Sequence, residues 1–313
     1  MKNFKMNSVK KFMIMNIILL VMTNCSTRHK KLSFINYPGL KLGFTTQNFT
    51  ECLPVSFENV IMLLDYAYEK GFTFFELRDP NAELTFEECS KIAGYASEKG
   101  IEVAYANQRG LLDPDFMNVF SKGVKNAKVF IGPKTIRATI SGLNFTENPG
   151  KTGLSKEEFT KAIEIANQAA QEAEGQGIQL VIENGAERFT ESNDSLFGFE
   201  SFFKKVNPNV AWQFDTANPF ANKDNFANPD SVKQYLEKHA GRIKYIHLKA
   251  AQNYQAQKVL GPNELDYGEL FRILSANNVN YISIELFVES DIDTVYKNMD
   301  MSIEFLRKSG FIN

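Results

Sequence analysis

From residue 40 onward, one hydrophobic pattern repeats: a short run of β-branched or aromatic residues is followed by a longer amphipathic segment. Short apolar runs bounded by turn residues are typical of buried strands, and apolar positions three or four residues apart are typical of helices. We expect strands at 42–48, 72–78, 101–107, 135–140, 178–184, 210–216, 243–249 and 281–287. We expect helices at 57–70, 85–99, 114–126, 155–176, 199–206, 230–240, 266–277 and 291–309.

Turn and cap residues separate these segments. Gly71, Gly100 and Gly177 are placed to end helices, and Ser155 with Glu158 three residues later is a capping box. Eight strands alternating with eight helices predict parallel pairing, and therefore an α/β fold of the (β/α)₈ TIM barrel type. A doubly wound open sheet is the alternative, but its glycine-rich dinucleotide turn is absent after the first strand. The fourth unit is the least regular, because 128–131 (KVFI) also has the pattern of a strand.

The N-terminus has the pattern of a targeting segment. Four lysines among the first eleven residues precede an apolar run at 12–22, and Cys25 follows closely. This order is typical of a bacterial lipoprotein signal, in which the cysteine becomes the lipidated first residue. We therefore expect a signal peptide at 1–24, a tether at 25–39, a single barrel domain at 40–313, and a periplasmic protein held to the membrane by a lipid. An uncleaved N-terminal anchor and an ordinary secretory signal are the alternatives.

The composition of the chain argues against some classes of binding partner. The 313 residues carry a formal net charge of −2 and the pI is about 6.1, so no broad basic face is available for nucleic acid. After the N-terminus, no run approaches the ~18 apolar residues of a membrane span. Cys52 and Cys89 have no patterned spacing, so we expect two unpaired thiols, with a disulfide as the alternative.

The residues that suggest chemistry lie at the ends of the last four strands. Glu183, Asp215, His247 and Glu285 are separated by 215 − 183 = 32, 247 − 215 = 32 and 285 − 247 = 38 residues, about one βα unit each. Each directly follows an apolar residue of its strand, and alternation along a strand then turns the polar residue into the barrel mouth. Three carboxylates and an imidazole would repel one another without a cation. They predict one divalent metal, with Mn²⁺, Mg²⁺ or Co²⁺ favoured and Zn²⁺ possible.

Other polar residues lie at or near the strand ends, and Lys249 and Gln213 share the inward faces of His247 and Asp215. They are expected to contact a substrate or, equally well, to satisfy one another's hydrogen bonds. They are Glu76, Arg78, Asn107, Arg137, Gln213 and Lys249.

The region from about residue 40 to 309 resembles the xylose isomerase-like TIM barrels, a group of sugar isomerases and epimerases that includes inosose dehydratase and endonuclease IV. The resemblance rests on IEN at Glu183, QFD at Asp215, IHLK at His247 and IEL at Glu285. It implies that these four residues bind the metal, as in the ketose 3-epimerases. It further implies that Glu183 and Glu285 exchange the substrate proton from opposite faces.

Two positions depart from the epimerase pattern. Asn218 stands where the epimerases carry a His, and Asn253 stands where they carry an Arg. Both belong to substrate binding, so Asn218 remains a candidate substrate contact while the ketose specificity stays open. The endonuclease branch is disfavoured, because a cluster of three zinc ions needs several histidines and only His247 lies in the candidate site.

The chemistry available to such a site follows from charge. A divalent cation chelated by a carbonyl and a neighbouring hydroxyl stabilises the enediolate that forms when the adjacent C–H loses its proton. Return of the proton from the opposite face is epimerisation, and return to the neighbouring carbon is isomerisation. Loss of a β-hydroxyl would make the protein a lyase or dehydratase acting on a keto-sugar or cyclitol, for which Lys249 is a candidate acid. The remaining alternative is a carbohydrate-binding lipoprotein without turnover. Free sugars or oligosaccharide fragments are the expected partners.

The lipoprotein hypothesis has a direct test. The Cys25→Ser variant lacks the thiol that would be lipidated, so we expect it to leave the membrane fraction and appear in the soluble fraction. The measurement is immunoblotting of both fractions beside the unsubstituted protein. A variant that stays with the membranes would contradict the lipid anchor.

Overall fold

The computed structural model describes residues 30–140, 153–185, 188–189, 197–224 and 226–313. Lys31–Asn313 form one compact unit. The expected signal peptide at 1–24 and Cys25 lie outside the described residues. Among the described residues, no helix combines the length and the hydrophobicity of a membrane-spanning segment.

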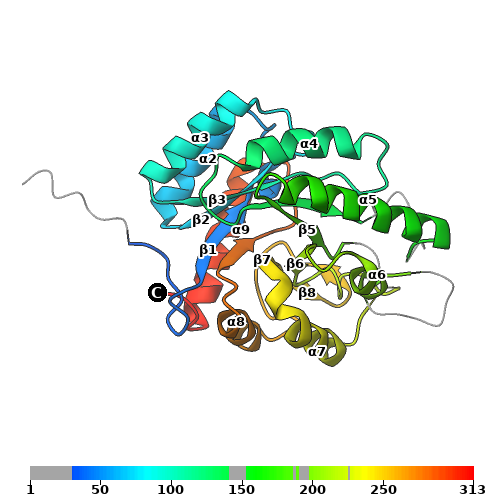
Figure 1. Ribbon diagram of the computed structural model, residues 1–313. Coiled ribbons are helices and arrows are strands. Elements are labelled where there is room, and N and C mark those ends of the chain that lie inside the picture. The colour runs from blue at the N-terminus through cyan, green and yellow to red at the C-terminus, as the bar shows by residue number, and fades with distance from the viewer. Residues whose placement is uncertain (1–29, 141–152, 186–187, 190–196, 225) are drawn as a thin grey trace, which may run out of the picture. The chain divides into compact units, whose positions relative to one another are not determined.

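Eight parallel strands form the sheet, as the sequence predicts. The pairing order is β3-β2-β1-β10-β7-β6-β5-β4, and the short antiparallel hairpin β8–β9 follows β7 (Figure 1). The strands are β1 (Lys41–Thr45), β2 (Phe74–Arg78), β3 (Glu102–Ala106), β4 (Thr135–Thr139), β5 (Gln179–Glu183), β6 (Ala211–Asp215), β7 (Ile243–Leu248), β8 (Ala251–Gln252), β9 (Gln255–Ala256) and β10 (Tyr281–Ile284).

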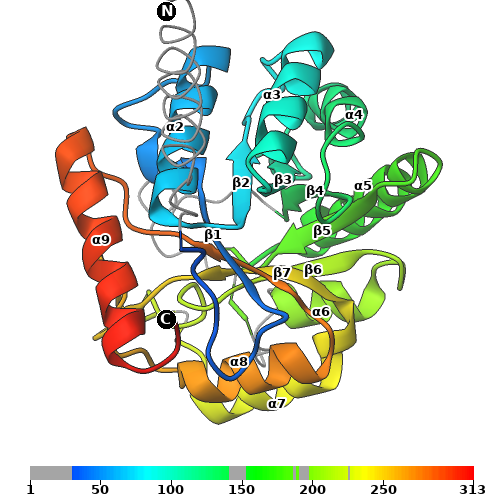
Figure 2. The same ribbon diagram turned by 90° about the vertical axis from the view of Figure 1, so that its left-hand side faces the viewer.

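The helices surround the strands and follow one another around the barrel in chain order (Figure 2). All eight expected helices are present, with ends within two residues or so of the predicted ones. The helices are α2 (Phe57–Lys70), α3 (Phe86–Glu98), α4 (Phe116–Ala127), α5 (Lys156–Glu174), α6 (Phe199–Lys205), α7 (Pro229–His239), α8 (Tyr267–Ala276) and α9 (Ile292–Lys308), with 3₁₀ turns η1 (Thr46–Phe49) and η2 (Ala240–Arg242). The fold is a (β/α)₈ TIM barrel.

The barrel is nearly closed between β3 and β4, where irregular backbone makes the junction. The Leu111 N–H donates to the Thr139 carbonyl at 2.9 Å, and the Val103 N–H donates to the Ile131 carbonyl at 2.7 Å. The segment 128–131 is therefore not a strand, contrary to its apolar pattern. It turns directly after α4, leaves the Ile131 side chain 59% exposed, and supplies a single carbonyl to β3.

The predicted caps are present. Ser155 and Glu158 form the reciprocal capping box of α5, and Gly71, Gly100 and Gly177 all have positive φ values after their helices. The two described cysteines are both unpaired, as expected.

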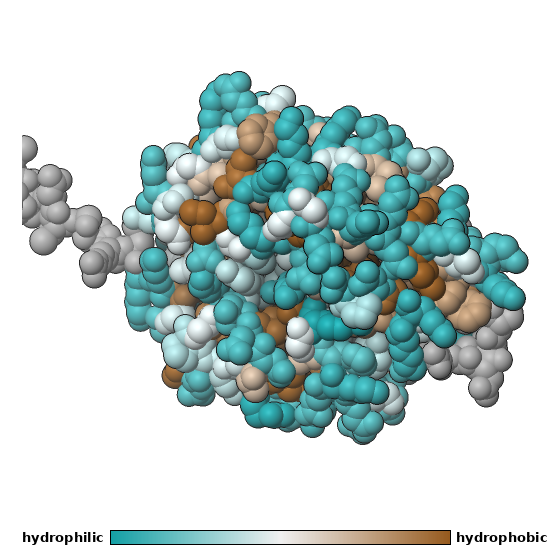
Figure 3. All heavy atoms as spheres, viewed as in Figure 1, coloured by the Kyte–Doolittle hydropathy of each residue, from teal (hydrophilic) through white to brown (hydrophobic). Residues whose placement is uncertain are grey.

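Two hydrophobic layers hold the barrel together. The larger layer fills the space between strands and helices, and a smaller one fills the barrel interior. Because this inner layer is apolar, polar side chains that point inward lie further along the strands, toward their carboxyl ends. On the outside, the face drawn in Figure 3 is mostly hydrophilic, with apolar residues in small separate groups. The inner layer consists of Phe74, Ala104, Val181, Ala211 and Tyr245.

The described part of the expected tether packs on the barrel. Leu32 and Phe34 are buried, the Leu32 N–H donates to the Gly71 carbonyl at 2.8 Å, and Phe34 forms an antiparallel bridge with Ile312. The compact unit therefore begins at Lys31 rather than at residue 40. The basic residues of this segment led to its prediction as a tether, but Leu32 and Phe34 belong to the hydrophobic core.

A pair of glycine substitutions tests the strand packing. A Cβ on Gly43 would lie 2.1 Å from the backbone carbonyl oxygen of Phe74 in the neighbouring strand, whereas Gly94 in α3 has nothing within 4 Å. We expect Gly43→Ala to lower the free energy of unfolding by about 1–3 kcal/mol through overpacking. The control, Gly94→Ala, should raise it by about 0.5–1 kcal/mol through helix propensity. Urea denaturation measures both, and equal effects would contradict the close β1–β2 approach.

Candidate active site

Four strand ends bring the expected tetrad together. Glu183 ends β5, Asp215 ends β6, His247 lies near the end of β7, and Glu285 follows β10 directly. One ligand atom from each lies within 4.8 Å of the others, and all four residues are buried. The strand register explains the convergence. Asp215 pairs with His247, and Ser283 also pairs with His247, so Glu285 stands one pleat further along on the same inward face.

The imidazole of His247 lies at the centre of the cluster. Its Nδ1 is 2.9 Å from Glu183 Oε1, 2.7 Å from Glu285 Oε2 and 3.8 Å from Asp215 Oδ2. Its Nε2 faces the other way, 2.7 Å from Glu76 Oε2 and in contact with the Gln213 amide. Carboxylates thus bracket both ring nitrogens, and Nδ1 is the nitrogen that faces the three other predicted ligands.

Charge in the cluster is strongly coupled. Burial opposes a charge on His247, but Glu76 and Glu285 outweigh it and raise the pKa of the imidazole. Burial would likewise raise the pKa of Glu76, but His247 and two arginines lower it to about 2. Glu76 therefore carries a full negative charge beneath the site and favours a proton on His247.

Three cations from the barrel mouth neutralise much of the tetrad's charge. Arg137 pairs with Glu183, the Arg78 guanidinium lies 3.2 Å from Glu285 Oε2, and Lys249 Nζ lies 3.1 Å from Glu285 Oε1 and 3.9 Å from Asp215 Oδ2. These side chains are buried or mostly buried. Part of the tetrad's negative charge is therefore offset by cations of the protein itself. Substrate contacts by Arg78, Arg137 and Lys249 stay predictions, as do those by Glu76 and Gln213.

Asn107, a candidate substrate contact at the end of the third strand, points away from the barrel interior. Ala104 belongs to the inner layer, whereas Val103 and Tyr105 belong to the outer one, so alternation turns residue 107 outward. Its amide donates to the Asp79 carbonyl at 3.0 Å, and its side-chain oxygen lies against Gly123 of α4. The Asn107 side chain thus links the loop after β3 to the loop after β2. The Asn107 backbone carbonyl accepts a hydrogen bond from Arg137 at 2.9 Å.

Asn218 lies beside the cluster. Its backbone N–H donates to Asp215 Oδ1 at 2.8 Å, and its amide donates to the Asn184 carbonyl at 2.9 Å. The amide is therefore already engaged within the protein, and a direct substrate contact by Asn218 stays a prediction.

Two asparagines that the sequence analysis did not single out orient the carboxylates. Asn184 accepts from the Asp215 N–H at 2.9 Å and donates to the Asp215 carbonyl at 3.0 Å. Asn48 brackets Glu285 in a similar way, donating to the Ile284 carbonyl and accepting from the Leu286 N–H. Both lie directly at predicted strand ends, which was the only signal for them.

The donor set fits one divalent cation. Asp215 Oδ1 accepts two backbone N–H groups, but Oδ2 is buried and has no hydrogen-bond partner among the described residues. Burial, the largest influence, raises the pKa of this carboxyl. An unpartnered carboxylate oxygen that faces two glutamates and an imidazole is what an oxygen-rich metal site would satisfy. The identity of the metal stays a prediction.

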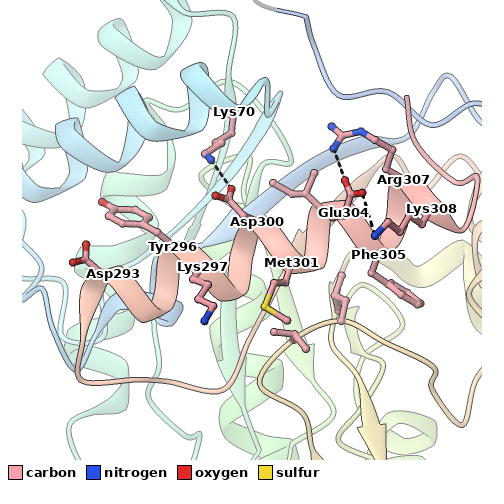
Figure 4. A pocket seen from close by; sticks show the side chains of 13 residues that line it. Lys70, Asp293, Tyr296, Lys297, Asp300, Met301, Glu304, Phe305, Arg307 and Lys308 are labelled. Carbon is pink, nitrogen blue, oxygen red and sulfur yellow. Dashed lines mark hydrogen bonds and ion pairs between the residues drawn. The ribbon is translucent and has the colours of Figure 1, made fainter.

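A groove of about 1040 Å³ elsewhere on the barrel has a different character. It runs along the outer side of α9, and its charged side chains are largely paired with one another, Lys70 with Asp300 and Glu304 with both Arg307 and Lys308 (Figure 4). The strand-end cluster, whose four ionisable residues are buried and close together, remains the candidate site.

Comparison with known proteins identifies solved structures of the same fold. Among solved structures, D-psicose 3-epimerase from Clostridium cellulolyticum H10, solved with D-tagatose, aligns with a TM-score of 0.62 at 16% identity, covering 86% of this chain and 99% of that one. A xylose isomerase-like TIM barrel protein from Mycobacterium smegmatis, in complex with magnesium, aligns with a TM-score of 0.62 at 13% identity, covering 86% and 97%. A sugar phosphate isomerase/epimerase from Parabacteroides distasonis aligns with a TM-score of 0.62 at 16% identity, covering 88% and 96%.

At these identities, the structural matches establish the fold. The search of curated proteins found no match. The family model described as xylose isomerase-like TIM barrel matches residues 64–309, which is most of the chain and contains the whole tetrad. The protein belongs to the xylose isomerase-like TIM barrel family.

Proposed function

We propose that the protein is a metal-dependent sugar isomerase or epimerase that moves a proton on the carbon next to a carbonyl. The observation that carries the proposal is the approach of two buried carboxylates, Glu183 and Glu285, to the same nitrogen of His247 from different strands. The sheet order separates β5 from β10 by two strands, β6 and β7, so the two carboxylates reach the cluster from different sides. Relatives in fold include D-psicose and L-ribulose 3-epimerases, which supports sugar chemistry.

Glu183, Asp215, His247 and Glu285 would hold the metal. When bound there, a divalent cation polarises a substrate carbonyl and makes the neighbouring C–H more acidic. The protein's own groups supply the rest. Asp215 and His247 act as ligands only, whereas Glu183 and Glu285 also take up and return the proton.

The charge network keeps the proposed bases in the right form. Burial would raise the pKa of Glu285, but Lys249, His247 and Arg78 hold it well below its usual range. Glu285 is therefore ionised at neutral pH and able to accept a proton. Arg137, which pairs with Glu183, fixes that carboxylate from the opposite side.

The alternatives have less support. Elimination relied on Lys249 as an acid, but its ammonium group is paired with Glu285 and lies close to Asp215. A binding protein without turnover would not need two buried carboxylates around one imidazole. We further propose that the protein acts in the periplasm, lipidated at Cys25, on free sugars or oligosaccharide fragments, since the N-terminal pattern favours that location.

Metal binding should appear as thermal stabilisation. A cation that binds only the folded state at a free concentration of about 100 times its dissociation constant adds about 2.7 kcal/mol to the free energy of unfolding. We expect Mn²⁺ to raise the Tm relative to EDTA, and Asp215→Asn to lose most of this shift while folding normally, because the amide keeps the shape of the carboxyl. Calorimetry with and without metal measures both proteins. Identical melting curves of the unsubstituted protein in Mn²⁺ and EDTA would contradict the metal site.

Proton exchange tests the division of roles. Glu183→Gln and Glu285→Gln each remove a base, so at saturating metal we expect each to lose solvent-deuterium incorporation by at least about 100-fold, the range for general acid–base catalysis. In an epimerase, each variant should lose exchange more from one substrate epimer than from the other. Mass spectrometry of sugars incubated in D₂O measures the effect. Asp215→Asn is the control, since excess metal should restore part of its activity.

Two outcomes would count against the proposal. Near-normal exchange in both glutamine variants at saturating metal would make the glutamates ligands only. Failure of the unsubstituted protein to exchange deuterium into any sugar of a broad panel would favour the binding protein.

A further inference from the structure

Two exposed aromatic side chains meet at the carboxyl end of the barrel. Phe226 lies in the loop after β6, and Tyr254 lies at the tip of the β8–β9 hairpin after β7. Their ring centroids are 5.1 Å apart at 79°, and the side chains remain 36% and 48% exposed. Phe226 also rests on the buried ring of Phe220, with centroids 5.8 Å apart. The pair is thus a supported apolar surface that faces solvent.

Hydrogen bonds fasten both loops beside the proposed active site. The Ala227 N–H donates to the carbonyl of Pro219, the residue after Asn218, at 2.8 Å. The hairpin begins two residues after Lys249 and is closed at its base by a bond from the Gln257 N–H to the Ala250 carbonyl at 2.8 Å.

Asn263 connects the two loops to each other. Its Oδ1 accepts from the Ala251 N–H at 2.8 Å, and its Nδ2 donates to the carbonyl of Thr216, the residue after Asp215, at 3.4 Å. The aromatic pair is therefore held in place relative to the proposed metal ligands.

The hairpin keeps Tyr254 at an unfavourable backbone position. Asn253 and Tyr254 are the two central residues of a two-residue turn, with φ values of 51° and 64°. Such a turn strongly prefers Asn-Gly, because the second position also needs a left-handed backbone. Asparagine tolerates a positive φ, so Asn253 suits the first turn position. A bulky tyrosine rarely adopts a positive φ, so Tyr254 is strained at the second position, and glycine in its place would remove the strain. Residues held in such sparsely populated backbone regions cluster at active sites and ligand-binding positions.

We propose that Tyr254 and Phe226 form an outer subsite that packs against a second ring joined to the sugar in the active site. The substrate class would then be a glycoside whose inner sugar bears a ketone, or a short oligosaccharide whose reducing end occupies the active site, because either supplies the carbonyl that the proposed reaction needs. The tetrad and its cations offer only polar contacts, which suit the oxygens of the inner sugar. The exposed rings offer an apolar surface, which suits the C–H face of a pyranose or a phenyl aglycone. This inference rests on the proposed function.

The test compares ligand pairs that differ only by the second ring. Glucose, galactose and xylose are titrated calorimetrically, each beside its phenyl β-glycoside, and glucose also beside cellobiose. We expect the two-ring ligands to bind about 2- to 12-fold more tightly than the free sugar, the ratio that one aromatic contact supplies. The cellobiose and phenyl arms show whether the second ring is a sugar or an aglycone. Equal affinity of every pair would overturn the proposal.

Tyr254→Gly makes the test specific. Glycine relieves the turn, so the Tm should rise, while the affinity ratio between two-ring and one-ring ligands falls to about one. Phe226→Ala should lower the ratio in the same way. Ile131→Ala is the control, since Ile131 is exposed before β4 at the opposite end of the barrel and should leave the ratio unchanged. A Tyr254→Gly variant that gains stability but keeps the ratio would overturn the subsite.

The same titrations separate this inference from the proposed function. If no sugar exchanges deuterium but the two-ring preference persists and depends on Tyr254, the proposed reaction fails and the subsite stands. If free sugars exchange deuterium and the two-ring ligands show no preference, the reaction stands and the subsite fails.

Discussion

The structure depends on the burial of several carboxylates around a single imidazole. Burying unpaired charge is costly, and each carboxylate here has a cation or hydrogen-bond donors that offset that cost. The partners come from three different strands: Arg78 from β2, Arg137 from β4 and Lys249 from the end of β7. The curvature of the sheet brings β2 close to β7, although β1 and β10 lie between them in the pairing order, so that Glu76 contacts His247. The barrel therefore positions the carboxylates and also brings the cations that balance their charge.

This balance also shapes how the site would handle a metal and a proton. His247 is held between Glu76 on one side and the tetrad's glutamates on the other, so its ring has little freedom to rotate. The two proposed bases are not equivalent. Glu183 is paired with Arg137, whereas Glu285 contacts both Arg78 and Lys249. Such asymmetry is expected of a site in which two carboxylates have different proton affinities at different stages of one reaction.

Most of the architecture could be read from the sequence, because hydrophobic periodicity is a local property. A strand followed by an amphipathic helix repeats often enough to fix the barrel, and parallel strands place their carboxyl ends at one edge. Glu183, Asp215, His247 and Glu285 could be found for the same reason, since each stands late on a strand and directly follows an apolar residue. The capping box of Ser155 and Glu158 could also be predicted, because its two residues are only three positions apart. Periodicity did not predict segment 128–131 correctly, because a short apolar run can form a turn as well as a strand.

What the sequence by itself determined, then, was the order of elements and the residues at each strand end. Tertiary structure decided which of those residues meet. The ion pair between Arg137 and Glu183 joins neighbouring strands. The ion pair between Arg78 and Glu285 joins residues 207 positions apart in the chain, and no local sequence pattern predicts it. The outward turn of Asn107 depended on the register of one strand, which a single-residue shift reverses. The contact between Phe226 and Tyr254 joins two loops with no common sequence signal. Periodicity fixes which face a side chain occupies, whereas contact distances depend on how the whole sheet closes.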